Sequence, residues 1–252
     1  MKQRMVVHAT ERDTLDASQI LHMWNLYKNY YTHVEKSQFI KDLDSYNYVL
    51  IGTEEPTGQF AGFMLVDLYV LDFEFDRVGI MYTGHTMFLP KYWGTKAVPT
   101  AMYKLAFSWK RKNRIKEMYW NLIAAGNRTY LAMCRNNYTY YPRYDRPTPA
   151  RMDRLLRHVG TQYFGESYDA ERGVIARDEP RAVFRSDQYA PFSDEVKALP
   201  EITFFLNRNP GYGKGDELSS LVKVSWHNVL YFALRSVYKL ARRRLLSRRR
   251  AH

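Results

Sequence analysis

A histidine in the middle of a β-forming run is the first residue that could do chemistry. The run extends from Arg77 to Leu89, stops at Pro90 and carries His85 near its centre. An imidazole titrates near neutral pH, so His85 could accept a proton from an amine. A histidine in a strand is also commonly a hydrogen-bonded structural residue, and the sequence leaves both interpretations open.

Three carboxylates come directly before this run. Asp72, Glu74 and Asp76 alternate along the chain. Such a group could bind an amine or supply a general base, and Glu74 is the one that we assign to catalysis. The alternative is a solvated loop between two strands.

A glycine-containing loop follows the run and leads into a helix. The loop comprises Lys91 to Lys96, with Gly94 inside it. Free backbone N–H groups at such a helix start, together with the positive end of the helix dipole, can bind a pyrophosphate. The helix itself is indicated by apolar residues at helical spacing, namely Met102, Leu105, Ala106 and Trp109.

The elements that must position these residues alternate in type. Up to about Tyr141 the expected order is β, α, α, β, β, β, α, β, α, which predicts a mixed α/β (α+β) fold: a central mixed β-sheet flanked by helices, with Met81–Leu89 central. The expected ranges are strands at 5–9, 46–53, 60–70, 77–89 and 117–123, and helices at 16–27, 35–43, after Pro99 and around Cys134.

The chain after Tyr141 has a weaker pattern of apolar residues than the chain before it. We expect a helix over 150–158, a buried strand over 202–206, a strand over 218–224 and a helix over 226–246. The glycine-rich loop over 209–216 lacks the Lys-Ser/Thr ending of a P-loop, so it predicts a lid or a flexible connection. We divide the chain into a core at 1–141, an extension packed on it at 142–225 and a basic amphipathic tail at 226–252.

The stretch from Met81 to Tyr138 resembles the GNAT (GCN5-related N-acetyltransferase-like) acyltransferase superfamily. The matching features are the strand Met81–Leu89, the loop Pro90–Gly94, the helix after Pro99, and Asn127 ahead of Cys134. The element order extends the resemblance to residues 1–141, so it implies a GNAT-like fold. The family loop has paired glycines, whereas here only Gly94 is present and Lys96 stands at the second position.

The resemblance implies an acyl thioester as co-substrate, either acyl-CoA or the acyl-phosphopantetheine of an acyl-carrier protein. The pantetheine arm would be held by the backbone groups of Met87, Phe88 and Leu89. A second set of residues would hold the pyrophosphate: Trp93, Gly94, Thr95, Lys96 and Ala97, with Asn127 contributing from the next helix. The family's general acid for the departing thiolate would correspond to Cys134 or, in its place, Tyr138, Tyr140 or Tyr141. Cys134 could equally be a buried helix residue.

Aromatic residues crowd the segment after Asn137. The tyrosines are Tyr138, Tyr140, Tyr141 and Tyr144. They could line a channel for an acceptor or an acyl chain longer than acetyl, or they could pack the extension onto the core with their hydroxyls in water.

The net charge of +12 is concentrated at the C-terminus. After Glu217 the chain has no acidic residue and nine basic ones, from Lys223 to Arg250. The tail combines an apolar aromatic helix with arginines, which favours a peripheral site at an anionic membrane surface. A nucleic-acid-binding tail is a weaker alternative, and a helix docked on the core with a basic end is a third.

Composition excludes several other classes. The single cysteine, Cys134, excludes a disulfide framework and a thiolate zinc cage, and the seven histidines show no metal spacing, so we expect no metal. No apolar run of about 18 residues occurs. We therefore expect a cytoplasmic N-acyltransferase that moves an acyl group from acyl-CoA or acyl-carrier protein to an amine acceptor, with a peripheral position at the inner membrane face as one option. The alternatives are a non-catalytic GNAT-like binding module and a nucleic-acid binder.

Overall fold

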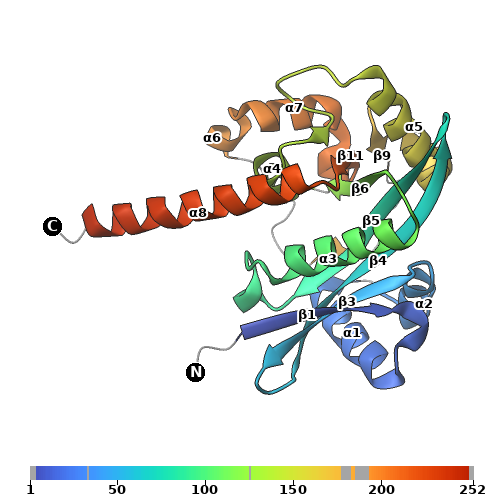
Figure 1. Ribbon diagram of the computed structural model, residues 1–252, viewed down its shortest axis with the longest axis vertical. Helices are drawn as coiled ribbons and strands as arrows, with labels where there is room; N and C mark the ends of the chain where they lie inside the picture. The colour runs from blue at the N-terminus through green and yellow to red at the C-terminus, as the bar shows by residue number, and fades with distance from the viewer. Residues whose placement is uncertain (1–3, 33, 125, 177–182, 185–192, 250–252) are drawn as a thin grey trace.

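A mixed β-sheet runs through the whole molecule (Figure 1). The computed structural model describes residues 4–32, 34–124, 126–176, 183–184 and 193–249, without the side chains of 32, 127, 128, 183, 184, 240 and 243–249. Within these residues, nine strands form the sheet in the order β1-β3-β4-β5-β6-β11-β9-β8, with β7 paired to β11. The strands are β1 (Arg4–Glu11), β3 (Tyr48–Glu55), β4 (Phe60–Phe73), β5 (Asp76–Phe88), β6 (Glu117–Ala124), β7 (Tyr140–Tyr141), β8 (Tyr168–Asp169), β9 (Val174–Ile175) and β11 (Glu217–Lys223).

The strands predicted for residues 1–141 are confirmed. Adjacent strands pair antiparallel except β5 and β6, which are parallel. The strand that contains Met81 is central, with β4 on one side and β6 on the other. Its residues are buried on both faces at Val78 to Met81, as expected of a strand covered by helices.

Helices cover both faces of the sheet. The first face carries α1 (Ala17–Tyr30) and α2 (Lys36–Asp44), which bury Met23, Tyr27 and Phe39 against Phe63 and Leu65 of β4. The helix α3 (Ala97–Lys112) packs on the opposite face through Met102 and Ala106. The start of α1 is fixed by a capping box, in which the Asp16 side chain accepts from Gln19 and the Gln19 side chain accepts from Asp16. One-turn helices lie at Arg12–Thr14 and Pro90–Tyr92.

The chain after Tyr141 extends the same sheet. Strand β11 pairs antiparallel with β6 from Leu218 to Lys223, so residues of the predicted extension complete the sheet of the predicted core. The helix α5 (Ala150–Phe164) covers β4 and β5 near their hairpin end, where Leu155 and Val159 pack on Val78 and Ile80. The division at residue 141 stays a prediction.

A second layer of short helices covers the far end of the sheet. It consists of α4 (Asn127–Asn136), α6 (Asp194–Lys197), α7 (Pro200–Arg208) and one-turn helices at Gly165–Ser167 and Pro210–Lys214. The strand predicted over 202–206 is wrong, because these residues lie in α7. Ile202 and Phe205 are three apart and both fully buried, and Pro200 occupies the first turn, where it needs no N–H partner.

The glycine-rich segment before β11 is a closed turn. The Asn209 side chain donates to the Asp216 carbonyl at 2.8 Å, and Tyr212 is buried with its ring 5.7 Å from that of Phe205. Outside the main sheet, β10 (Val183–Phe184) pairs with β2 (Tyr31–Thr32), and the sequence predicted neither.

The predicted C-terminal helix is confirmed as α8 (Trp226–Arg249). It leaves the body beside α4 and extends away from it (Figure 1). None of the helices in the described parts of the chain is both long and apolar enough to cross a membrane.

Candidate functional site

The two parallel strands at the centre of the sheet separate part of the way along. Val78 to Tyr82 of β5 pair with Glu117 to Asn121 of β6, and the pairing stops there. Beyond that point β6 continues beside β11, while the β6-facing edge of β5 at residues 83–88 has no strand partner among the described residues. The opening between β5 and β6 therefore presents backbone groups that an extended ligand can bind.

A hydrogen bond marks the point of separation. The Trp120 indole Nε1 of β6 donates to the Thr83 hydroxyl of β5 at 2.9 Å. Where the backbone hydrogen bonds between β5 and β6 end, this side-chain hydrogen bond joins the two strands instead.

A β-bulge lies beside this opening. Gly84 is opposite Leu65 and Met87 is opposite Phe63, so His85 and Thr86 together face the single residue Met64. His85 has a backbone φ of 24°, a value that residues other than glycine rarely adopt. A bulge changes the direction of the residues within it, and such features concentrate next to active sites.

The loop after β5 has unused amides at the start of α3. No acceptor in the described part of the chain takes the N–H groups of Gly94, Lys96, Ala97 and Val98. Gly94 has φ of 74° and open space around it, and Lys91 anchors the loop to buried Glu54 through an ion pair of 2.5 Å. These amides lie at the positive end of the 16-residue helix, a place where negative charge is favoured.

Some of the expected pantetheine-binding groups already have partners. The Trp93 indole donates to the Phe88 carbonyl at 2.7 Å, and the Leu89 N–H donates to the Ala61 carbonyl at 2.9 Å. The Met87 side chain is buried in the cluster with Tyr27. Trp93, Gly94, Thr95 and Lys96 are exposed, and Ala97 is half-buried. Asn127 begins α4, and its side chain lies outside the described set.

His85 faces the helices α1 and α2. Its Nε2 lies 3.4 Å from an Asp42 carboxylate oxygen, and its ring meets the Tyr27 ring edge-on at 5.1 Å. Burial, together with the Asp42 charge, raises the pKa of Tyr27 to about 12, so this hydroxyl stays protonated at neutral pH. A carboxylate beside an imidazole can hold the ring in one orientation.

Tyrosines surround one carboxylate on the same face of the sheet. Asp67 of β4 is directly opposite Tyr82 of β5, and the Tyr163 hydroxyl hydrogen-bonds to the Asp67 carboxylate. Burial raises the pKa of Asp67. The rings of Tyr82 and Tyr163 are 4.3 Å apart, and Tyr46 stacks on Tyr82. These groups lie between the hydrophobic cluster under α1 and α2 and the one under α5.

Glu74 does not join His85. It lies in the turn between β4 and β5 and forms ion pairs with Arg154 at 2.7 Å and Arg151 at 3.5 Å. Nine residues of extended strand separate Asp76 from His85, which is roughly 30 Å. The contacts of Glu74 hold α5 on the hairpin, so we do not keep Glu74 in the candidate site.

Cys134 and Tyr138 line one hollow of about 290 Å³ with residues of α8. Cys134 is buried in α4, where it hydrogen-bonds to Tyr130 and Tyr140, and burial raises the pKa of its thiol to about 11. Tyr138 is 58% exposed, and its ring lies 5.9 Å from that of Tyr231. The structure thus brings these two predicted residues into one place, with only Tyr138 open to solvent.

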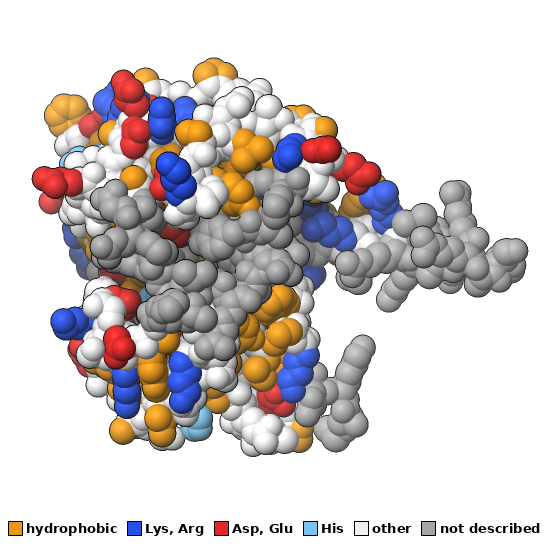
Figure 2. Space-filling model, turned by 180° about the vertical axis from the view of Figure 1, so that it is seen from behind, with side chains coloured by type: hydrophobic (Ala, Val, Ile, Leu, Met, Phe, Trp, Pro, Cys, Tyr) orange, Lys and Arg blue, Asp and Glu red, His pale blue; other side chains and the backbone are white. Residues whose placement is uncertain are grey.

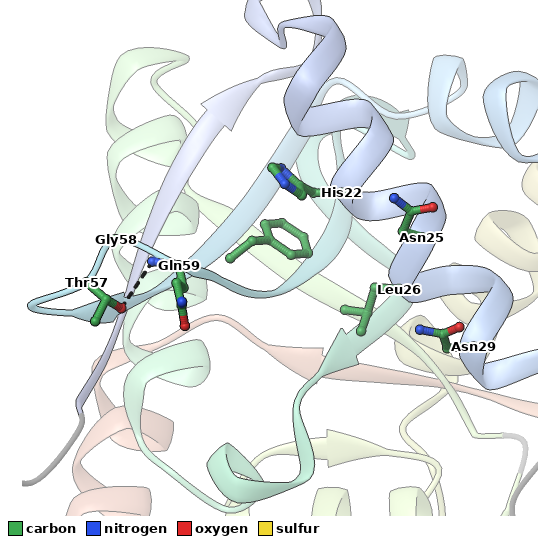
Figure 3. Close-up of a pocket in the computed structure, with 8 residues that line it drawn as sticks. His22, Asn25, Leu26, Asn29, Thr57, Gly58 and Gln59 are labelled. Carbon is green, nitrogen blue, oxygen red and sulfur yellow. Dashed lines mark hydrogen bonds between the residues drawn. The ribbon is translucent and has the colours of Figure 1, made fainter.

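A second hollow, of about 560 Å³, was not predicted from the sequence (Figure 3). It lies between α1 and the turn joining β3 to β4, with His22 beside Phe60 at a ring distance of 5.6 Å. Its α1 side is formed by His22, Asn25, Leu26 and Asn29. Their spacing of three and four residues is the signal that could have indicated a shared helix face.

No group of three or more metal-binding side chains is present among the residues that the structure describes. The candidate site consists instead of the His85 imidazole with the Asp42 carboxylate, the unpaired edge of β5 and the free amides at the start of α3.

Comparisons with known proteins give distant structural likenesses only. No family model matches the sequence, and no curated protein does. The aminoglycoside N-acetyltransferase AAC(6')-Iy, solved with CoA, is 13% identical with a TM-score of 0.35, over 48% of this chain and 79% of its own. An acetyltransferase from Trypanosoma brucei is 12% identical with a TM-score of 0.37, over 58% and 100%. Arabidopsis thaliana NAA60, solved with a bisubstrate analogue, is 10% identical with a TM-score of 0.35, over 54% and 86%. Each of these three likenesses covers about half of this chain.

Proposed function

We propose that this protein is an N-acyltransferase that transfers an acyl group from a thioester to an amine. The observation that carries the proposal is the opening between β5 and β6, which lies beside the bulge at His85 and is followed by the unused amides at the start of α3. A thioester donor has an extended, amide-containing arm and a pyrophosphate, and these two parts match the strand edge and the helix start.

In this proposal the chain divides the chemistry among three places. The donor arm lies along β5 and its pyrophosphate accepts from the amides of Gly94, Lys96, Ala97 and Val98. His85, oriented by Asp42, takes the proton of the attacking amine as the new C–N bond forms. The C–S bond breaks, and the leaving thiolate takes a proton from an acid.

Tyr138 fits the role of that acid better than Cys134 does. Cys134 is buried in α4, where its thiol already hydrogen-bonds to Tyr130 and Tyr140, so a leaving thiolate cannot readily reach it. Tyr138 has an exposed hydroxyl in the same hollow.

Calorimetric titration with CoA tests donor binding. We expect the Gly94→Asp variant to lose at least tenfold in affinity, because it adds a negative charge beside the amides and a side chain at φ of 74°. Gly215→Asp is the matched control, since Gly215 also has positive φ and open space around it but lies far along the chain, before β11. Equal affinities for both folded variants would refute the pyrophosphate assignment.

A non-catalytic binding module is the second candidate. The observation that favours it is the Trp93 indole on the Phe88 carbonyl, which occupies an acceptor that a donor arm would use. CoA release from acetyl-CoA and a long-chain acyl-CoA, measured with a panel of amines, separates the two. Binding without release of CoA for any amine would support the module.

The donor and the location are also part of the proposal. The donor is acyl-CoA or the acyl-phosphopantetheine of a carrier protein, and the hollow at Leu26 and Phe60 offers apolar surface for an acyl chain. We place the enzyme in the cytoplasm at the inner face of a membrane, on the basis of the nine basic residues that follow Glu217.

A further inference from the structure

The helix α8 is attached to the body through a buried polar residue. Asn228 is fully buried, and its side-chain oxygen accepts from the N–H groups of Tyr138 and Thr139, both at 2.8 Å. Its side-chain nitrogen donates to the carbonyls of Thr139 at 2.9 Å and Lys223 at 2.8 Å. Four hydrogen bonds therefore fix which side of α8 faces the body.

The apolar side of α8 faces solvent. Five large apolar residues are exposed, at fractions of 59 to 71%: Trp226, Leu230, Leu234, Val237 and Tyr238. At about 100° per residue they share one side of the helix, with four of them at least a third of a turn from Asn228 and Tyr238 about 80° from it. A helix docked on the core would bury this stripe, so that alternative does not describe α8.

The basic residues lie on the same extended helix. Arg235, Lys239 and Arg242 lie on the side of Asn228, and the sequence continues with Arg243, Arg244, Arg248, Arg249 and Arg250. Seen from behind, basic side chains lie where the helix leaves the body (Figure 2). Pairing two copies of this stripe would bring like charges together, because no acidic residue follows Glu217. An anionic surface removes that repulsion.

We propose that the stripe of Trp226, Leu230, Leu234, Val237 and Tyr238 is a membrane-docking face, which inserts between the headgroups of an anionic phospholipid bilayer while the arginines contact the lipid phosphates. This inference goes beyond acyl transfer and does not depend on it. The exposed aromatic residues suit the interface between headgroups and acyl chains, and the helix lies in the plane of the surface.

Flotation with vesicles tests the docking face. The full-length protein is mixed with phosphatidylcholine vesicles that contain or lack phosphatidylserine. We expect flotation with the anionic vesicles, at least tenfold less with the neutral ones, and a decrease as salt is added. The variant Leu230→Gln/Leu234→Gln should reduce flotation at least tenfold, and Leu21→Gln, at a 48% exposed leucine on α1, should not.

Three outcomes would overturn the inference. One is a full-length protein that does not float with anionic vesicles at low salt. Another is a stripe variant that floats like the wild type while its circular-dichroism melt is unchanged. The third is a stable dimer in sedimentation that the stripe variant converts to monomer, which would assign the stripe to a second copy.

Discussion

The Trp120 indole donates to the Thr83 hydroxyl at the residue where β5 and β6 stop pairing. The bond holds the two strands at a fixed separation, and the edge of β5 beyond it is left for a ligand. A sheet with full pairing at this place would have no such edge.

This bond should couple the two strands measurably. We expect Trp120→Phe and Thr83→Val each to lower the free energy of unfolding, with a coupling energy of about 1 kcal/mol in the double-mutant cycle. Urea denaturation of the four proteins measures it. If the effects of the two changes on the free energy of unfolding are additive, the Trp120–Thr83 bond does not stabilise the place where β5 and β6 separate.

The pair of His85 and Asp42 should control turnover and leave donor binding unchanged. We expect His85→Ala to slow acyl transfer about 100-fold or more while the CoA affinity stays within twofold, because a base acts on the amine alone. Asp42→Asn should slow it less, since the imidazole keeps its base function but loses the carboxylate that orients it. An unchanged rate for folded His85→Ala would return this residue to a structural role.

The buried thiol should be slow to react. Burial raises the pKa of Cys134 to about 11, so at pH 8 only about one thiol in 1,000 is ionised, and the reactive thiolate increases tenfold for each pH unit up to 11. We expect labelling by iodoacetamide in the native protein to follow that slope, and rapid labelling in denaturant. Fast native labelling at pH 7 would contradict the burial of this side chain.

The long strands and the order of elements in residues 1–141 were predictable because their apolar runs are long and their turns are marked by Pro56, Gly58 and Pro90. The run at 202–206 was misread as a strand, since five apolar residues fit a strand or a buried helix equally well. Strands of two residues, such as Tyr31–Thr32 and Val174–Ile175, depend on tertiary pairing and leave no pattern in the sequence.

The site was predictable only in part. His85 and Gly94 were selected from local patterns, and the structure gives them a bulge and a free helix start. Asp42 was missed because it lies 43 residues before His85, and only the packing of α2 on the sheet brings them together. Glu74 is near His85 in the sequence, but most of the residues between them lie in the extended strand β5, so the two side chains are far apart in space.

Hydrogen–deuterium exchange with and without CoA tests the account most directly. The account predicts that CoA protects amides at residues 83–89 and 94–98, along the unpaired edge of β5 and the start of α3, and leaves α8 at 226–238 unchanged. Binding of CoA with protection elsewhere, or no change in either stretch at saturating CoA, would contradict it.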